Sequence, residues 1–293
     1  CDSDPAGTAD ATPDVAVDGV VPAPDAATPS DARATPDASL VPDAAVPTDA
    51  TAAERVLFVG NSYTAANSLA ALVGDLLAEA GLGGYTLAHS PGGRTLEQHA
   101  ADADGTNGDT TLRQYLVTGP AAAQGWDVVV LQEQSQIPGF PETDPYWVAS
   151  LAGATVLRDL AVATGADVVL FLTWGRRDGD SQNPTLYPDY STMQDRLTAG
   201  YTSLADQLAA GGDEIYLGPV GEAWRQLHDA GDATAFGALY SADGSHPSVE
   251  GSYLAACVFF ATLTGSSPVG LTAAPAGIDP AERLALQGIA ETL

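Results

Sequence analysis

Short runs of apolar residues alternate along most of the chain with longer stretches in which apolar residues recur every three or four positions. The short runs predict strands, and the recurring spacing predicts helices with one buried face. Strands are expected over Arg55–Val59, Tyr85–His89, Asp127–Gln132, Ala166–Thr173 and Glu214–Leu217. Helices are expected over about Ala65–Ala80, Trp147–Ala163, Met193–Leu208, Gly251–Leu263 and Pro280–Leu293.

Strands that alternate with helices predict a parallel sheet, because right-handed crossovers place the helices on both of its faces. The expected fold is a three-layer α/β/α sandwich with a five-stranded parallel, flavodoxin-like sheet. Sheets of this kind bind ligands beyond the carboxyl ends of their strands. The residues that follow the five strands are therefore the first place to look for chemistry.

Residues 1–53 do not share this pattern. They are mainly Ala, Asp, Pro, Thr and Val, with ten aspartates, eight prolines and one arginine. Too few large apolar side chains are present to offset the entropy lost on ordering, and prolines and like charges keep such a segment extended. We expect a disordered stalk over 1–53 and one folded domain over 54–293. A segment that binds a partner is the alternative interpretation of the stalk.

The charge of the chain excludes one class of partner. Its ten basic residues, all arginine, face 38 acidic residues, which gives a formal net charge of -28. Nucleic acid is not expected as a partner, because phosphate binding requires a basic surface.

The two cysteines need separate explanations. Cys257 lies in an almost wholly apolar helical stretch, which predicts a packed core thiol. Cys1 is followed by a flexible segment, and this resembles a bacterial lipoprotein after removal of its signal peptide. The resemblance implies a lipid on Cys1 that anchors the chain to a membrane of the bacterial cell envelope, facing the periplasm or the exterior. A sequence boundary that falls at cysteine by chance is the alternative.

A serine stands at the end of the first expected strand, in the turn Gly60-Asn61-Ser62. A nucleophile is favoured there, because unpaired N–H groups at the start of the next helix attract developing negative charge. Simple turn and capping chemistry explains the same residues. A serine nucleophile needs a histidine base and, usually, a carboxylate that orients it. Asp243, three residues before His246 in a glycine-containing loop, offers such a pair, although an ordinary turn explains that spacing about equally well.

The order of these motifs resembles that of the SGNH, or GDSL-like, hydrolases, from about Arg55 to Leu263. Within that superfamily the chain is similar to a bacterial branch known mainly as a domain of unknown function. The strings that carry the resemblance are Gly60-Asn61-Ser62, Gly92-Gly93, Leu131-Gln132-Glu133-Gln134-Ser135, Thr173-Trp174-Gly175 and Asp243-Gly244-Ser245-His246-Pro247-Ser248.

The resemblance implies a role for each matching residue. Ser62 would be the nucleophile, His246 its general base and Asp243 the orienting acid. The oxyanion hole would combine the backbone N–H of Ser62 with that of Gly92 or Gly93 and with a side-chain amide. Most of the superfamily supplies this amide from an asparagine in a Gly-x-Asn-Asp block, which the chain lacks, so the donor here is expected to be Gln132 or Gln134.

Three further residues are candidates for contact with the substrate. Asn61 adjoins the nucleophile, Trp174 could stack on a sugar ring, and Arg176 could bind a carboxylate or sugar hydroxyl groups. A solvated arginine and a tryptophan that caps the core are the alternative interpretations of the last two.

No cofactor or metal ion is expected. The acidic stretch Asp102–Asp109 has the oxygen-rich composition of a calcium loop, but its glycine and acids do not fall at EF-hand positions. Zinc is not expected, because no group of His, Cys, Asp and Glu has the usual ligand spacing along the sequence.

The expected function is that of a serine esterase acting through an acyl-enzyme on a small-molecule or glycan ester. Removal of O-acetyl groups from carbohydrate is the preferred subclass. The alternative is a surface-tethered carbohydrate-binding lipoprotein with a weak or inactive hydrolase site, which the missing Gly-x-Asn-Asp block motivates.

Overall fold

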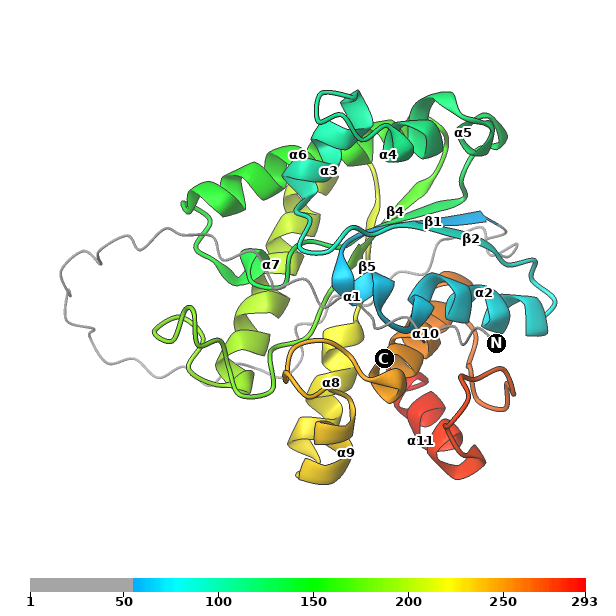
Figure 1. Cartoon of the computed structure of the whole chain (residues 1–293), viewed down its shortest axis with the longest axis vertical. Coiled ribbons are helices and arrows are strands. Elements are labelled where there is room, and N and C mark those ends of the chain that lie inside the picture. Colours follow the sequence, from blue (N-terminus) through cyan, green and yellow to red (C-terminus); the bar gives the residue numbers. More distant parts are fainter. Residues whose placement is uncertain (1–54) are drawn as a thin grey trace, which may run out of the picture. The chain divides into compact units, whose positions relative to one another are not determined.

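The computed structural model of the chain describes residues 55–293. Within them, the five expected strands form one parallel sheet in the order β2-β1-β3-β4-β5 (Figure 1). The predicted α/β fold with a flavodoxin-like sheet is therefore confirmed. The predicted stalk over 1–53 and Cys1 lie outside the described residues. The strands are β1 (Arg55–Val59), β2 (Tyr85–His89), β3 (Val128–Leu131), β4 (Asp167–Phe171) and β5 (Ile215–Gly218).

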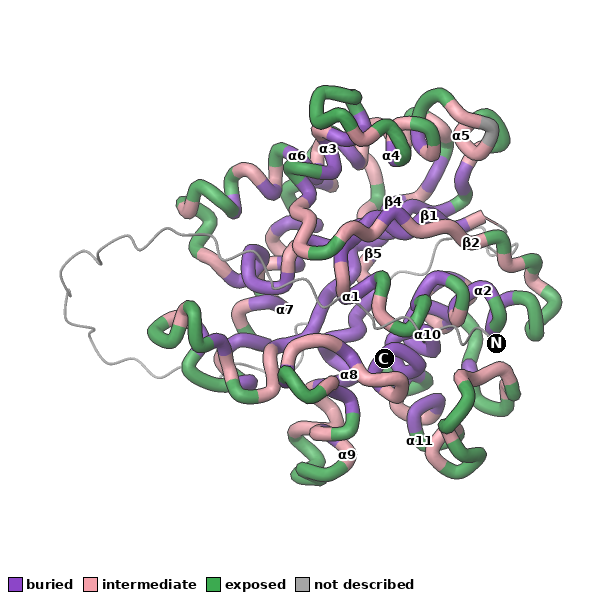
Figure 2. The backbone as a smooth tube through the Cα atoms, viewed as in Figure 1, coloured by how far each residue is buried: buried purple, intermediate pink, exposed green. Residues whose placement is uncertain are grey.

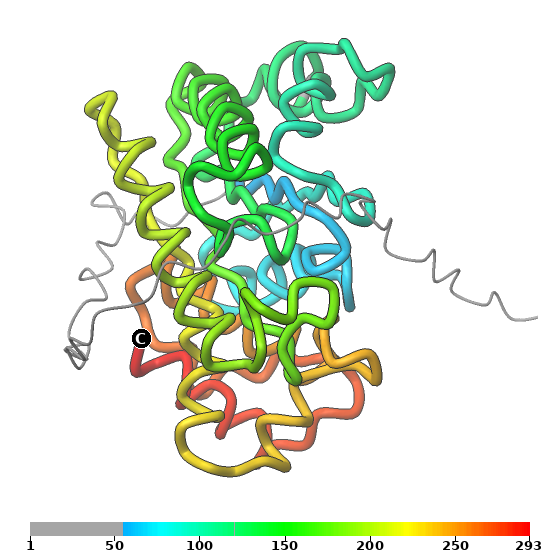
Figure 3. Tube along the Cα trace, turned by 90° about the vertical axis from the view of Figure 1, so that its left-hand side faces the viewer, coloured from blue at the N-terminus to red at the C-terminus, as the bar shows by residue number. Residues whose placement is uncertain are grey.

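Helices cover both faces of this sheet. In Figure 1, α3 and α6 lie on one side of the strands and α2 and α10 on the other, and Figure 3 gives the same division after a 90° turn. The helices are α1 (Ser62–Ala65), α2 (Leu69–Glu79), α3 (Leu96–Asp104), α4 (Thr111–Arg113), α5 (Pro120–Gln124), α6 (Pro145–Val162), α7 (Tyr190–Ala209), α8 (Val220–Asp229), α9 (Ala233–Ala238), α10 (Val249–Thr264) and α11 (Pro280–Ala290). Shorter helical turns are η1 (Ala66–Ser68), η2 (Gln114–Thr118) and η3 (Ile137–Gly139).

The apolar residues of β1, an inner strand of the sheet, divide between two cores. Val56 and Phe58 face the cluster that contains α2 and α10, whereas Leu57 and Val59 face the cluster that contains α3 and α6. This alternation is the period-two pattern of a strand, and a strand buried on both faces needs apolar residues at every position. Figure 2 shows the resulting buried band along the strands.

The helix α10 is buried around most of its circumference. It packs against α2, α8, α11 and β5. Cys257, in its middle, is fully buried, and this burial raises the pKa of its thiol to about 12. The predicted core thiol is confirmed. Among the described residues, no helix combines the length and apolar character needed to cross a membrane.

The helix expected over about Ala65–Ala80 is interrupted. Helix α1 already begins at Ser62, and the chain kinks before α2 at Asn67 and Ser68, whose φ angles are 50° and 58°. Such left-handed angles are uncommon outside glycine. The Asn67 side chain donates hydrogen bonds to Ser248 O and Ser252 Oγ, each 2.8 Å long, so tertiary contacts hold the kink.

Candidate active site

Ser62, His246 and Asp243, here called the triad, are joined by two hydrogen bonds. The distance from Ser62 Oγ to His246 Nε2 is 2.8 Å, and that from His246 Nδ1 to Asp243 Oδ2 is 2.6 Å. A carboxylate can only accept, so Nδ1 carries the proton and Nε2 offers its lone pair to the serine hydroxyl. This is the tautomer that a general base requires.

Asp243 and His246, the candidate acid and base, lie in one tight loop between α9 and α10. The second oxygen of Asp243, Oδ1, accepts hydrogen bonds from the backbone N–H groups of Ser245 (2.9 Å) and His246 (3.0 Å). Burial raises the pKa of Asp243, but the bonds from His246 and these two N–H groups outweigh it, and the pKa lies below its usual value. Asp243 is therefore ionised at neutral pH.

Ser62, the candidate nucleophile, lies at the turn between β1 and α1. Asn61 caps α1 by accepting the Tyr63 N–H through Oδ1 at 3.2 Å. Its amide nitrogen donates to the carbonyl oxygens of Arg94 (3.1 Å) and Glu133 (3.4 Å). Asn61 is buried, so the residue expected to touch substrate instead fastens the nucleophile turn to the loops that follow β2 and β3.

Two residues that the sequence did not single out connect the halves of the triad. The Tyr63 hydroxyl lies 2.7 Å from Ser245 Oγ, and its ring packs edge-on against the His246 imidazole with centroids 5.4 Å apart. Asn67, through its bonds to Ser248 and Ser252, joins the kink after α1 to the start of α10. Neither residue carries chemistry itself, so no motif could have indicated them.

The two glycines expected at the oxyanion hole follow β2, next to the nucleophile turn. Strand β2 pairs with β1 in register, with His89 opposite Val59, and Gly60 N–H donates to His89 O at 3.0 Å. Gly93 has a φ of 67°, and a Cβ added at Gly92 would meet nothing within 4 Å. This loop is therefore a tight turn with open space on one side.

The side chains of Gln132 and Gln134 have different surroundings. Gln132 is fully buried, and its amide oxygen accepts from Asn61 N (3.0 Å) and Thr64 Oγ1 (2.9 Å). Its nitrogen donates to Asn61 Oδ1 at 2.9 Å and to Glu133 O. Both N–H groups of Gln132 are thus used inside the protein, which corrects the expectation that it could donate to an oxyanion. The amide of half-buried Gln134 donates once, to Gln136 Oε1, and so has one N–H beyond that bond.

This difference predicts unequal effects of two like substitutions. We expect Gln132→Ala to lower the free energy of unfolding by about 2–4 kcal/mol, because buried groups of Asn61 and Thr64 lose their partners. Gln134→Ala, the matched control, should change it by less than about 1 kcal/mol. Urea denaturation followed by tryptophan fluorescence measures both values. Equal destabilisation by the two variants would contradict the assignment.

No protein-family model matches the chain, and no curated protein matches it. A solved structure from Slackia heliotrinireducens, classed as an SGNH hydrolase, is 31% identical and covers 72% of this chain and 98% of its own, with a TM-score of 0.53. The chain belongs to the SGNH hydrolases. It is therefore a hydrolase of the esterase type at the level of the family.

Two further solved structures have lower sequence identity to the chain. A DUF4886 family protein from Bacteroides uniformis is 20% identical over 81% of this chain and 93% of its own, with a TM-score of 0.59, and shares the fold. A catalytic mutant of an acetylxylan esterase from Geobacillus stearothermophilus is 19% identical over 75% of this chain and 98% of its own, with a TM-score of 0.48. The second likeness is too weak to indicate a substrate.

Trp174 is not accessible to a substrate in this structure. Its side chain is fully buried between Tyr63 and Trp224, with ring centroids 4.7 Å and 4.2 Å away and interplanar angles of 2° and 6°. Its indole N–H donates to Ser245 O at 3.0 Å. The expectation of a sugar platform is therefore wrong, and the ring instead supports Tyr63 and the loop that carries His246.

Arg176 lies close to the site but is held by the protein. Its guanidinium donates to Asp180 Oδ1 at 2.9 Å and to Ser135 Oγ at 3.2 Å, and its side chain is 13% exposed. These bonds join the loop after β4 to the loop after β3. Only the small exposed part of the Arg176 side chain could contact a substrate.

Glu133 is a buried carboxyl group behind the nucleophile turn. It accepts hydrogen bonds from the N–H groups of Leu96 (3.1 Å) and Gln134 (2.6 Å). Burial, opposed by bonds from Ser150 and these N–H groups, raises the pKa of Glu133 to about 7. The folded state therefore binds a proton more tightly than the unfolded state does, so this residue's stabilising contribution is complete below the usual glutamate pKa and is lost as pH rises towards 7.

We expect Glu133→Gln to remove this pH dependence. Between about pH 5 and pH 8, wild type should lose roughly 2 kcal/mol of unfolding free energy relative to the variant. Chemical denaturation of both proteins at the two pH values measures the difference. If the difference in unfolding free energy between the two proteins stayed constant with pH, the Glu133 carboxyl group would not be protonated in the folded state.

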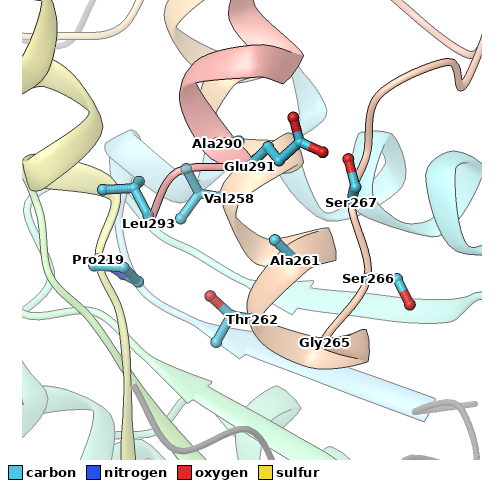
Figure 4. Close-up of a pocket in the computed structure, with 10 residues that line it drawn as sticks. All are labelled: Pro219, Val258, Ala261, Thr262, Gly265, Ser266, Ser267, Ala290, Glu291 and Leu293. Carbon is cyan, nitrogen blue, oxygen red and sulfur yellow. The ribbon is translucent and has the colours of Figure 1, made fainter. Parts of the chain in front are cut away.

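A separate hollow of about 200 Å³ lies beside the end of α10 (Figure 4). Its walls come from α10, the residues that follow it and the C-terminal end of the chain, and they include Thr262, Ser266 and Glu291. No triad residue lines it. The hollow therefore does not belong to the ester site.

Proposed function

We propose that the chain is a serine esterase that forms an acyl-enzyme on Ser62. The observation that carries the proposal is the hydrogen-bonded order Ser62, His246, Asp243, with heavy-atom distances of 2.8 Å and 2.6 Å, in a chain that belongs to the SGNH hydrolases. His246 takes the serine proton as Oγ attacks the ester carbonyl, and returns it to the leaving alcohol. Water, activated by the same histidine, then releases the acid.

The oxyanion that forms during the attack needs donors that do not have to reorganise. We assign this task to the Ser62 N–H, to an N–H of the glycine pair Gly92 and Gly93, and to the side-chain amide of Gln134. The full internal bonding of Gln132 favours Gln134 as the third donor. The Gln134→Ala variant described above should then lower kcat by about 10²–10³-fold, the usual effect of losing one such donor.

The preferred substrate in this proposal is a short acyl ester of a polar alcohol, such as an O-acetyl group on carbohydrate. Support comes from the polar groups around the triad. Ser245 precedes His246, donates its backbone N–H to Asp243 and carries a hydroxyl group 2.7 Å from the Tyr63 hydroxyl, and the His246 and Asp243 side chains are 35% and 49% exposed. A polar, open rim suits hydroxyl-rich alcohols better than long acyl chains, whose binding requires apolar surface.

Two measurements on the full chain test the proposal. Incubation with an organophosphonate probe followed by peptide mapping should place one covalent adduct on Ser62. Initial rates on p-nitrophenyl esters should fall as the acyl chain lengthens from acetate to octanoate, and acetate should be released from acetylated xylan. No adduct and no hydrolysis would overturn the esterase, whereas faster octanoate hydrolysis would overturn only the acyl preference.

A further inference from the structure

A cluster of imidazole and carboxylate groups lies behind the nucleophile turn, where the ester chemistry gives it no task. It consists of His89 at the end of β2, and His99 and Asp102 on α3, all at least nine-tenths buried. Each offers one ligand atom, and these atoms all lie within 4.8 Å of one another. Asp102 Oδ2 is 3.5 Å from His89 Nε2 and 3.9 Å from His99 Nδ1.

His99 is prepared as a ligand by its own hydrogen bond. Its Nε2 donates to Gly60 O at 2.7 Å, which leaves the lone pair of a neutral ring on Nδ1. Nδ1 is fully buried and has no hydrogen-bond partner in the part of the chain that the structure describes. Histidines that bind metal ions usually have this arrangement, with the other ring nitrogen donating to a carbonyl group or carboxylate.

A fourth ligand and a route to solvent come from Asp109. Its Oδ2 lies 3.9 Å from His89 Nε2, and its side chain is 34% exposed. Both oxygens of Asp102 accept hydrogen bonds: Oδ2 from Arg94 at 2.9 Å, and Oδ1 from Arg94 at 2.7 Å and from Asn107 at 2.9 Å. Hydrogen-bonded carboxylates of this kind are typical of metal ligands that are held in place.

We propose that His89, His99, Asp102 and Asp109 bind one divalent cation of the zinc type. Tetrahedral zinc places neighbouring ligand atoms about 3.4 Å apart, given bonds of about 2.0–2.2 Å to nitrogen and oxygen. Asp102 lies 3.5 Å from His89 and 3.9 Å from His99, and the ligand atoms of these three residues all lie within 4.8 Å of one another, so small side-chain shifts would close the three. Asp109, 3.9 Å from His89, stands outside that group and would have to turn towards it to become the fourth ligand. Two imidazoles favour zinc over calcium or magnesium, which prefer oxygen ligands only.

An alternative explanation is that the N–H group at His89 Nε2 only donates a hydrogen bond to Asp102 Oδ2, 3.5 Å away. That arrangement would satisfy His89, but it gives the buried Nδ1 of His99 no proton to accept. A metal ion satisfies both histidines at once. The site could not be predicted from the spacing of residues along the chain, because the fold alone brings His89 to α3.

The site would act as a support for the nucleophile turn. Gly60 is tied to the cluster on both sides, since its N–H donates to His89 O at 3.0 Å and its carbonyl accepts from His99. Ser62 follows two residues later. The ion would therefore fix the position of the turn and would not touch the substrate.

The test uses the full chain, stripped with a chelator and titrated with Zn²⁺ alone by calorimetry, and with Co²⁺ followed by visible absorption. We expect one ion per chain, a higher melting temperature, and the intense d–d bands of four-coordinate Co²⁺. His89→Gln should weaken binding at least 100-fold. His228→Gln is the matched control, because His228 is half-exposed on α8 beside Asp229 and outside the cluster.

Several outcomes would overturn the proposal. These are a wild-type chain without saturable binding, the weak spectrum of six-coordinate Co²⁺, or equal affinity in the two histidine variants. If His89→Gln does not fold, the stoichiometry of Zn²⁺ binding and the Co²⁺ spectrum of the wild-type chain still test the proposal. None of these readouts depends on esterase activity, so their failure would leave the proposed function unaffected.

Discussion

Ser62→Ala is expected to slow hydrolysis of p-nitrophenyl acetate by the full chain by on the order of 10⁴-fold or more, because triad residues act as a unit. The hydroxyl that lies 2.8 Å from His246 Nε2 is the only group the variant loses. Without it, no acyl-enzyme forms, and the remaining rate reflects binding and oxyanion stabilisation alone. Initial rates at saturating ester, measured for both proteins at equal concentration, give the ratio.

A matched serine variant separates chemistry from folding. Ser191→Ala removes a hydroxyl from the exposed Ser191 on α7, and we expect it to keep the wild-type rate. Both variants should unfold at the wild-type temperature to within a few degrees, since neither leaves a buried polar group unpaired. A Ser62→Ala protein that is folded and still hydrolyses the ester at the wild-type rate would rule out Ser62 as nucleophile.

Asp243→Asn is expected to reduce kcat/KM by roughly 10³–10⁴-fold, as in enzymes where the orienting carboxylate becomes an amide. Asparagine can keep the acceptor for the N–H groups of Ser245 and His246, so the loop should stay folded. Its NH₂ group, however, would face His246 Nδ1 in place of Oδ2. The imidazole would then move its proton to Nε2 and lose the lone pair that accepts the Ser62 proton.

The measurement is kcat/KM for p-nitrophenyl acetate, beside Asp178→Asn as the control. Asp178 is exposed and pairs with Arg177 outside the triad, so its variant should remain within a few-fold of wild type. If Asp243→Asn also stayed within a few-fold, the carboxylate would have no orienting role, and the loop would serve only to position the histidine.

The sheet could be predicted from the sequence because its signal is local. In β1, every residue from Val56 to Val59 is apolar and fully buried, and the strand alternates between two cores, so a short apolar run was sufficient. The strand ends were less certain. Gln132 and Thr173 were expected within strands, but each follows the last paired residue, Leu131 or Phe171, because an apolar pattern does not show where backbone pairing stops.

The candidate site could be predicted only where its side chains lie close together in the sequence. Asp243 and His246 share a turn, so their pairing could be anticipated. Trp174 could not be assigned, because whether a tryptophan after a strand faces solvent or a neighbouring ring depends on Trp224, fifty residues later in the chain. For the same reason, the hydrogen bonds of Gln132 to Asn61 and Thr64 could not be predicted, because these partners lie more than sixty residues earlier in the chain.

The triad joins two regions that are synthesised far apart in time. Ser62 and His246 are separated by 184 positions in the chain, and α10, which follows His246, covers the buried face of α2. A growing chain on the ribosome therefore holds its serine hydroxyl long before the base is made. Under the proposed mechanism, hydrolysis cannot begin in any N-terminal fragment that stops short of His246, so the appearance of activity during synthesis would report the closing step of folding.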